Sequence, residues 1–236
     1  MKKTFAALAL IIGLVPVQAF AQSSVVSQIV GDSAATEKLY FSLKLGLNVA
    51  YLQGAATGAD RTGNFNAGLT ATIRLSERLS LTPEITLLSR KGISNIPFEM
   101  TGDPALDPYF TDPESSALAL KYTDIPVLIK YRFGRIHVGA GPLVAFLSSA
   151  SERFRAELES GEELRFKRAV TDRYKKRDFG LVVEASWTIT KPRRGTGLVF
   201  HVRYQAGMTD VLKVPSDAGP LRNSAVQAYV SFPFVR

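Results

Sequence analysis

The chain has 236 residues, no cysteine and a formal net charge of +8. This length is enough for one large β domain, and a sequence without cysteine excludes disulfides and thiolate metal sites. The charge is modest, and no basic helix or base-stacking motif accompanies it, so nucleic acid is not a predicted partner. The same charge fits the phosphates of a membrane surface.

Residues 1–21 have the pattern of a signal peptide. Lysines at the start precede an apolar run that is too short to cross a bilayer as a helix, and the small residues of an A-x-A cleavage site end at Ala21. We therefore expect cleavage before Gln22, with an uncleaved anchor as the alternative. Residues 22–38 are predicted to be a flexible periplasmic leader, and residues 39–236 to form the folded domain.

Apolar and polar residues alternate along eight segments of that domain, and a period of two residues indicates β-strands. Short connections between neighbouring segments predict antiparallel hairpins. Most segments have about ten residues, which is long for a soluble strand but suits a tilted strand that crosses a bilayer. The expected strands are residues 39–51, 64–75, 79–87, 118–131, 136–146, 179–189, 198–208 and 226–234.

In the fourth of these segments, the apolar positions change from even to odd numbers near Asp124. A β-bulge inserts one residue into a strand and turns the following side chains to the other face. We therefore expect a bulge in this strand near Asp124.

The connections alternate between long and short along the chain. Long connections are expected at residues 54–63, 92–116, 148–176 and 209–223, so all of them fall at one end of an antiparallel sheet. This alternation is typical of outer-membrane barrels, which have short periplasmic turns and long external loops. The predicted fold class is all-β: a closed, antiparallel, eight-stranded transmembrane β-barrel with short periplasmic turns and long extracellular loops.

The size of the side chains indicates which face of the sheet is outside. A soluble, lipocalin-like barrel would place the apolar set inside, but an eight-stranded bore has no room for so many bulky groups. The apolar set is therefore predicted to face lipid. The opposite set, which is predicted to line the lumen, includes many small residues: Gly46, Ala50, Gly68, Ser80, Gly139, Gly141, Gly180, Ser186 and Gly207.

Aromatic residues near the strand ends support the same orientation, because aromatic side chains concentrate at both membrane interfaces. At the short-turn end we expect Phe41, Tyr131, Trp187, Phe232 and Phe234. At the long-loop end we expect Tyr51, Phe65, Tyr122, Phe146 and Phe179.

Several ionisable residues are predicted to point into the lumen, where charges must be paired and hydrogen-bonded. We expect Glu184 to pair with Arg203, and Glu84 with Lys44 or Lys130. Such a network would plug the lumen, since a narrow bore leaves little room for a continuous water column; a gated ion path or a catalytic cluster is the alternative. The predicted lumen network is Lys44, Glu84, Lys130, Glu184, His201 and Arg203, with Arg74, Arg135 and His137 on the same faces.

An enzyme is not predicted, and neither catalytic residues nor cofactors are assigned. Some small outer-membrane barrels modify lipid A, and a hydrolase needs a serine, a histidine and an acid within hydrogen-bond reach. The chain has only two histidines. Neither His137 nor His201 has a serine two residues away on the same face, and both are expected to point away from lipid.

Two of the long loops carry charge patterns. Residues 152–178 begin with glutamates and end with lysines and arginines, so the halves could pair as a hairpin above the membrane whose basic half contacts lipopolysaccharide phosphates; a solvated loop is the alternative. Residues 103–114 are acidic, but they lack the regular oxygen-ligand spacing of a calcium loop. A proline-rich surface loop is expected there and no metal site.

Segments spread over nearly the whole mature chain resemble the outer-membrane β-barrel family that includes PorT-like proteins, often described as porin family proteins. They read KLGLN, LTPEITLLSRKG, YTDIPVLIKYRF, VGAGPLVAF and RYQAGMTDV. The most specific piece is Tyr-x-x-Ile-Pro-x-x-x-Lys-Tyr, from Tyr122 to Tyr131. The resemblance implies an OmpX-like barrel in the outer membrane of a diderm bacterium but no shared activity. One departure is the ending, where Val235-Arg236 follows the aromatic Phe234.

The leading functional prediction is a monomeric, non-enzymatic outer-membrane protein with a structural role or loop-mediated surface contacts. Outer-membrane lipid and lipopolysaccharide are the expected partners, together with a possible envelope protein at the external loops. A narrow porin or ion channel is one alternative. An accessory component of a secretion or envelope-assembly machine, as the PorT-like resemblance implies, is another.

Overall fold

The computed structural model describes residues 38–54, 60–95, 103–109, 116–158, 161–193, 196–214 and 219–234. The predicted signal peptide, the predicted leader except Lys38, and the Val235-Arg236 ending lie outside these residues. Among the described residues, no helix is both long and apolar enough to cross a membrane.

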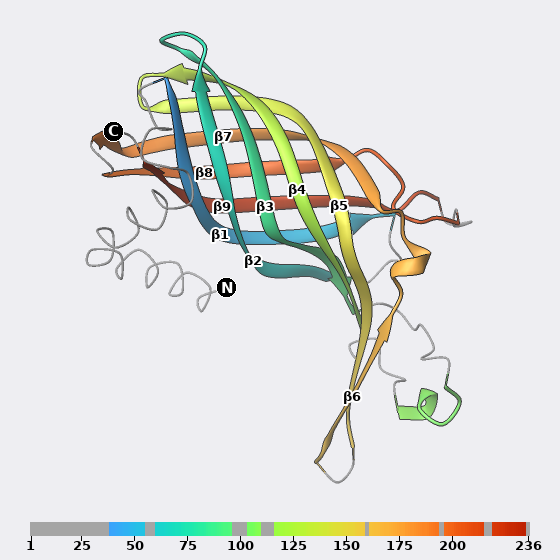
Figure 1. Ribbon diagram of the computed structural model, residues 1–236. Coiled ribbons are helices and arrows are strands. Elements are labelled where there is room, and N and C mark those ends of the chain that lie inside the picture. Colours follow the sequence, from blue (N-terminus) through green and yellow to red (C-terminus); the bar gives the residue numbers. More distant parts are fainter. Residues whose placement is uncertain are drawn as a thin grey trace.

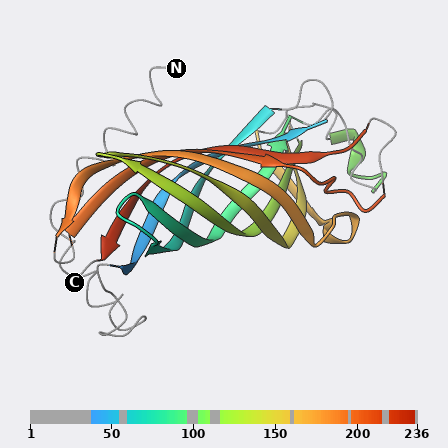
Figure 2. The ribbon, with the colours of Figure 1, turned by 90° about the horizontal axis from the view of Figure 1, so that it is seen from above.

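Nine strands form one antiparallel sheet in the order β4-β3-β2-β1-β9-β8-β7-β5-β6, and β4 also pairs with β5. The second pairing closes eight strands into a ring and leaves β6 outside it, as Figures 1 and 2 show. The predicted closed eight-stranded barrel is confirmed. The strands are β1 (Leu39–Gln53), β2 (Asp60–Arg74), β3 (Leu79–Ser94), β4 (Ser116–Phe133), β5 (Ile136–Glu157), β6 (Glu163–Ala169), β7 (Arg177–Arg193), β8 (Thr196–Gly207) and β9 (Arg222–Phe234), with short 3-10 turns at Asp107–Tyr109 and Thr171–Arg173.

The register places all short connections at one end of the barrel and all long ones at the other (Figure 1). The first and last strands close the ring along their length, from Phe41 opposite Phe234 to Gln53 opposite Arg222. Because the ring has an even number of strands, β1 begins and β9 ends at the short-turn end. This arrangement is that of an outer-membrane barrel with its long loops outside the cell.

The bulky apolar side chains face outward, as predicted. Phe65, Trp187 and Leu181 leave 54%, 57% and 50% of their surface exposed, which an apolar solvent around the barrel accommodates. Small inward residues make room for larger ones. A Cβ on Gly46 would lie 2.2 Å from the Cβ of Tyr229, and a Cβ on Gly139 would lie 2.7 Å from Cγ of Lys130.

The predicted bulge in the fourth strand was placed wrongly. Even-numbered side chains of β4 stay buried both before and after Asp124. The irregularities lie in the two neighbouring strands instead. In β3 the register with β4 shifts between Thr86 and Ser89. In β5 it shifts at Ser148, because Lys121 pairs with Ser149 whereas Tyr122 pairs with Leu147. The apolar positions change parity without a bulge in β4, because inward Leu118, Leu120 and Tyr122 before Asp124 belong to an internal apolar cluster, whereas the apolar residues at 125, 127 and 129 after it face outward.

An apolar cluster fills the external end of the lumen. Tyr122 belongs to it and is only 1% exposed, so its predicted place in the external aromatic belt is wrong. Even-numbered residues of β4 point inward at this height, where β3 and β5 bring further apolar side chains against them. The buried members are Leu52, Ile93, Leu118, Leu120, Tyr122, Ala145, Ala150, Val170, Tyr174 and Val211.

Strand β6 was not among the eight expected strands. It pairs with the outer part of β5, from Ser151 opposite Ala169 to Glu157 opposite Glu163. The two strands form a hairpin that projects beyond the barrel at the external end (Figure 1). The expected hairpin is therefore confirmed, although Glu152 opposite Arg168 is the one acid–base pair that faces directly across these two strands.

Candidate functional site

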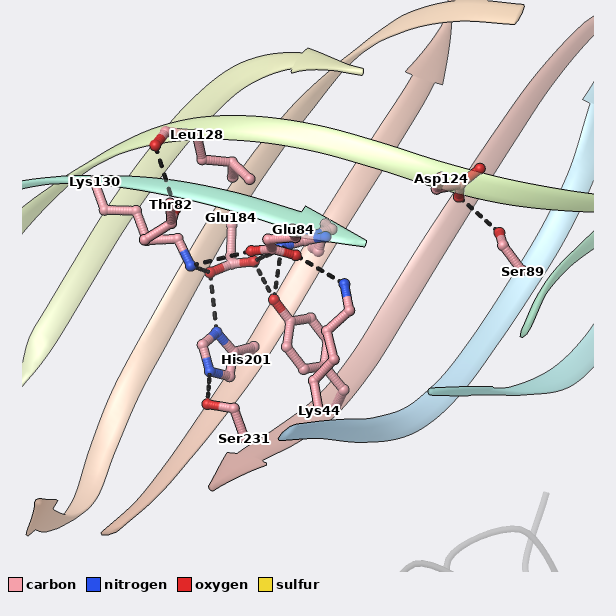
Figure 3. A network of polar contacts seen from close by, with 12 residues as sticks. Lys44, Thr82, Glu84, Ser89, Asp124, Leu128, Lys130, Glu184, His201 and Ser231 are labelled. Carbon is pink, nitrogen blue, oxygen red and sulfur yellow. Dashed lines mark hydrogen bonds and ion pairs between the residues drawn. The ribbon is translucent and has the colours of Figure 1, made fainter. Parts of the chain in front are cut away.

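All six residues of the predicted lumen network lie together in the middle of the barrel (Figure 3). Strand alternation brings them there, because each occupies an inward position on its strand. They come from five strands: Lys44 on β1, Glu84 on β3, Lys130 on β4, Glu184 on β7, and His201 and Arg203 on β8.

Glu84 contacts three cations at once. Its Oε2 lies 2.7 Å from Nζ of Lys44, and its Oε1 lies 3.5 Å from Nζ of Lys130. Nη2 of Arg203 donates to both carboxylate oxygens at 2.8 Å. The expected choice between Lys44 and Lys130 was therefore too narrow, because Glu84 pairs with both and with Arg203.

Glu184 is the second centre of the network. Its Oε1 lies 2.6 Å from Nζ of Lys130 and 2.9 Å from Nδ1 of His201. Its Oε2 accepts from Nε of Arg203 at 2.8 Å and from the hydroxyl of Tyr229. Both oxygens are thus occupied by donors, which a buried carboxylate requires.

Two network residues on β9 were missed from the sequence, Tyr229 and Ser231. The Tyr229 hydroxyl accepts from Nη2 of Arg203 at 2.7 Å, and its ring stacks on His201 with centroids 4.3 Å apart and planes at 6°. Ser231 lies 2.8 Å from Nε2 of His201. Alternation along residues 226–234 could have found both, because they fall between outward residues of that segment.

The network carries a surplus of positive charge. Three cations, Lys44, Lys130 and Arg203, face two carboxylates, and every one of these side chains is at most 9% exposed. With so little solvent to screen them, each charge depends on its neighbours for compensation. Of the three cations, Lys130 lies nearest the short-turn end, where it borders a cavity.

Ser231, His201 and Glu184 have the hydrogen-bond order of a hydrolytic triad. The expectation that His201 has no serine within reach is therefore wrong, because the neighbouring strand β9 supplies Ser231. Two features oppose catalysis. Ser231 pairs with Lys44 on β1 and Val199 on β8, so the sheet occupies the backbone amides that could stabilise an oxyanion. Glu184 also binds Lys130 and Arg203, and these cations weaken its electrostatic interaction with His201.

A second buried ion pair lies nearer the external end. Nζ of Lys91 is 3.0 Å from Oδ1 of Asp124. The Ser89 hydroxyl donates to Oδ2 of Asp124 at 2.7 Å, the contact that Figure 3 shows. Uninterrupted alternation along β3 would place Lys91 outside, because Glu84 points inward. The register shift between Thr86 and Ser89 turns it inward instead. Among the described residues, no three metal-ligating side chains gather into a metal site.

The other predicted lumen residues, Arg74, Arg135 and His137, lie apart from the network. They line a cavity of about 280 Å³ at the short-turn end, below Lys130 and His201, which also border it. Arg74 and Arg135 are exposed there, whereas His137 is half-buried.

Fold and site define a small transmembrane barrel with a charged network across its interior. The family model described as "Outer membrane protein beta-barrel domain" matches residues 20–213, and the chain belongs to this family. The protein is accordingly an outer-membrane β-barrel of a Gram-negative bacterium. The narrower PorT-like resemblance stays a prediction.

Solved outer-membrane barrels are similar to this chain at low identity. Neisserial surface protein A has 12% identity over 84% of this chain and 98% of its own, with a TM-score of 0.42. Ail, the attachment invasion locus protein of Yersinia pestis, solved with the heparin analogue sucrose octasulfate, has 10% identity over 84% and 99%, with a TM-score of 0.40. The N-terminal barrel domain of Pseudomonas aeruginosa OprF has 7% identity over 82% and 97%, with a TM-score of 0.32. No curated protein matches the sequence.

Proposed function

We propose that this protein is a non-enzymatic outer-membrane barrel with a closed lumen that acts through its external surface. Its β5–β6 hairpin would contact anionic groups, and lipopolysaccharide phosphates are the nearest such groups. The observation that carries this proposal is a row of four cations along one face of the hairpin, which the two glutamates of that face, Glu157 and Glu163, balance only in part. The closed lumen is supported by two layers of side chains, the charged network and the apolar cluster above it.

Like charges stand directly opposite each other on the exposed face of the hairpin. Arg153 pairs with Lys167 across the strands, and Arg155 pairs with Arg165. Such pairs destabilise a sheet, so this face gains stability when an anion binds to it. Cations in a row also suit phosphate, because arginine binds phosphate oxygens through two parallel hydrogen bonds.

Only part of this charge is balanced within the hairpin. Glu163 contacts Nε of Arg155 at 2.6 Å and also binds Arg165. The hydrogen bond from Arg165, aided by the charge of Arg155, lowers the pKa of Glu163, so its carboxylate is ionised at neutral pH. Arg153 and Lys167 form no ion pair with any described residue.

The opposite face of the hairpin is packed within the hairpin and against the 3-10 turn at Thr171–Arg173. Phe154 is buried and its ring lies 5.9 Å from that of Phe166. Glu152 accepts from Nε of Arg168 at 2.9 Å and lies 3.2 Å from Nη1 of Arg173. This packing gives the hairpin a defined orientation, so its cationic face is presented outward as one surface.

The test is binding of lipid A with and without its phosphates. Detergent-solubilised protein should bind the phosphorylated form more tightly, and Arg153→Gln with Lys167→Gln should weaken that binding roughly tenfold, equivalent to about 1.4 kcal/mol. Lys175→Gln with Lys213→Gln removes the same charge from other exposed external positions and should have little effect. Equal losses in both double variants would refute a specific role for the hairpin and leave only general charge attraction.

The non-enzymatic part of the proposal has its own test. Refolded protein in bilayers should show no ester hydrolysis and no fluorophosphonate labelling that depends on Ser231. Any background signal should therefore be the same in the wild type and in Ser231→Ala. Turnover that depends on Ser231 and on His201 would overturn this part and make the buried triad-like chain an active site.

A further inference from the structure

The cavity at the short-turn end, hereafter the vestibule, is strongly basic. Its volume is about 280 Å³, and it is formed by the β2–β3 and β4–β5 turns together with the lumen faces of the adjoining strands. Among the described residues, five cations line it and a single carboxylate, that of Glu77. The cations are Arg74, Arg78, Lys130, Arg132 and Arg135.

Of these cations, Lys130 is paired with Glu184 in the lumen network, whereas the four arginines form no ion pair with any described acid. Arg132 donates to the backbone carbonyl of Glu77 at 2.6 Å, and Arg78 lies 3.5 Å from the hydroxyl of Tyr131. Both contacts orient a guanidinium without cancelling its charge. The lumen network, to which Lys130 belongs, carries one further surplus positive charge above these arginines. Concave sites lined by one sign of charge concentrate ions of the opposite sign.

The vestibule also offers neutral hydrogen-bond donors. Hydroxyl groups of Ser42, Thr70, Thr72, Ser80 and Thr188 line its wall. Nδ1 of His137 is enclosed yet has no hydrogen-bond partner among the described residues. Because this atom is enclosed, an anion in the vestibule meets other atoms of the His137 ring and changes the environment of the ring without bonding to Nδ1.

We propose that the vestibule is a binding site for a phosphate-type oxyanion that enters from the periplasmic side. Several arginines and hydroxyl donors match the many acceptor oxygens of such an anion. The volume is near the lower limit of small-molecule sites, which span about 300–1,000 Å³, so one compact group fits and an extended sugar chain does not. The same chemistry is present in free phosphate and in the headgroup of a periplasmic-leaflet lipid.

Histidine NMR provides a direct test, because both histidines of the chain, His137 and His201, line the vestibule. Histidine-labelled protein in non-ionic maltoside micelles would be titrated with inorganic phosphate, acetate or chloride at constant pH and ionic strength. We expect saturable shifts of His137 with phosphate, weaker shifts with acetate and none with chloride. Shifts that never saturate, or that are equal for all three anions, would overturn the proposal.

Variants separate the vestibule from general surface charge. Arg132→Gln with Arg135→Gln should weaken phosphate binding at least tenfold, while the hairpin variant Arg153→Gln with Lys167→Gln, which removes the same charge, should leave it unchanged. Unchanged denaturant midpoints in both variants would show that the barrel is intact. Equal affinity in the vestibule variant and the wild type would contradict the site. The hairpin takes no part in this site. A negative result for phosphate binding in the vestibule therefore does not affect the proposed external contacts, and a negative result for the hairpin does not affect the vestibule.

The source of the oxyanion follows from a second arm. Nanodiscs of phosphatidylcholine alone and nanodiscs containing phosphatidylglycerol would be compared without added phosphate. His137 shifts that require phosphatidylglycerol and are lost in the vestibule variant assign a lipid headgroup. Shifts that appear only with inorganic phosphate assign a free anion. Absence of both would refute the site.

Discussion

Replacement of Glu184 by glutamine probes the charged network most sharply. Glutamine keeps the shape of glutamate but exchanges one oxygen for an NH₂ donor. In the structure, one oxygen faces Lys130 and His201, and the other faces Arg203 and Tyr229. Whichever way the amide turns, its NH₂ group therefore meets a cation, and one buried positive charge loses its nearest partner.

The expected loss is large because the site is dry. Glu184 and Arg203 are both almost completely buried, and breaking a buried ion pair by removing one partner costs about 3–5 kcal/mol. In the variant, three cations would share the single carboxylate of Glu84. Reversible urea unfolding in lipid vesicles should report a loss of this size in the free energy of unfolding, with an unchanged dependence on urea.

A second substitution should restore much of the stability. Adding Arg203→Met to Glu184→Gln leaves Lys44, Lys130 and Glu84, which have the same surplus charge as the native network. Glu157→Gln in the exposed hairpin is the control and should leave the midpoint unchanged. The account of the network would be refuted by a double variant no more stable than Glu184→Gln alone.

Two further predictions concern the faces of the strands. Leu69→Arg should destabilise the barrel by about 2–4 kcal/mol in vesicles if the site is near the bilayer midplane. Val214→Arg is the control and should leave the stability unchanged, because Val214 is 79% exposed in an external loop. Equal losses of stability in the two variants would contradict the lipid-facing assignment of Leu69. Gly46→Ala should lower the free energy of unfolding by about 1–3 kcal/mol, because the added methyl group overpacks against Tyr229. Gly63→Ala should leave it unchanged, since a Cβ there would meet no atom within 4 Å. Similar urea midpoints for the two variants would show that Tyr229 does not need the space at Gly46.

The sequence was sufficient for the barrel and for most of its faces, because alternation reports directly which side chains share a side of a strand. The opposite sizes of the two sets then decided which side meets lipid. The same logic placed Lys44, Glu84 and Arg203 inside, although it could not rank their contacts. Distances across a barrel depend on the register between strands, which a single strand's pattern does not contain.

The errors have a common physical origin in irregular pairing. A shift between Thr86 and Ser89 turns Lys91 inward, so its pair with Asp124 was invisible to a uniform pattern of alternation. Tyr122 was assigned to an interface belt because aromatic residues near strand ends usually lie there. In this barrel an apolar cluster occupies the external end of the lumen, and an inward tyrosine packs within it. Strand β6 was not predicted because it is short and mostly charged, and it contains few apolar residues to show an alternating pattern.

Planar-bilayer conductance of the refolded wild-type protein tests the central claim of a closed lumen most directly. The network and the apolar cluster together predict no steady open channel, and no passage of sugars in a parallel vesicle-swelling assay. Glu184→Gln should show more brief openings than the wild type, since it loosens the network. A steady, sugar-permeable channel in the wild type would contradict the account and identify the protein as a narrow porin.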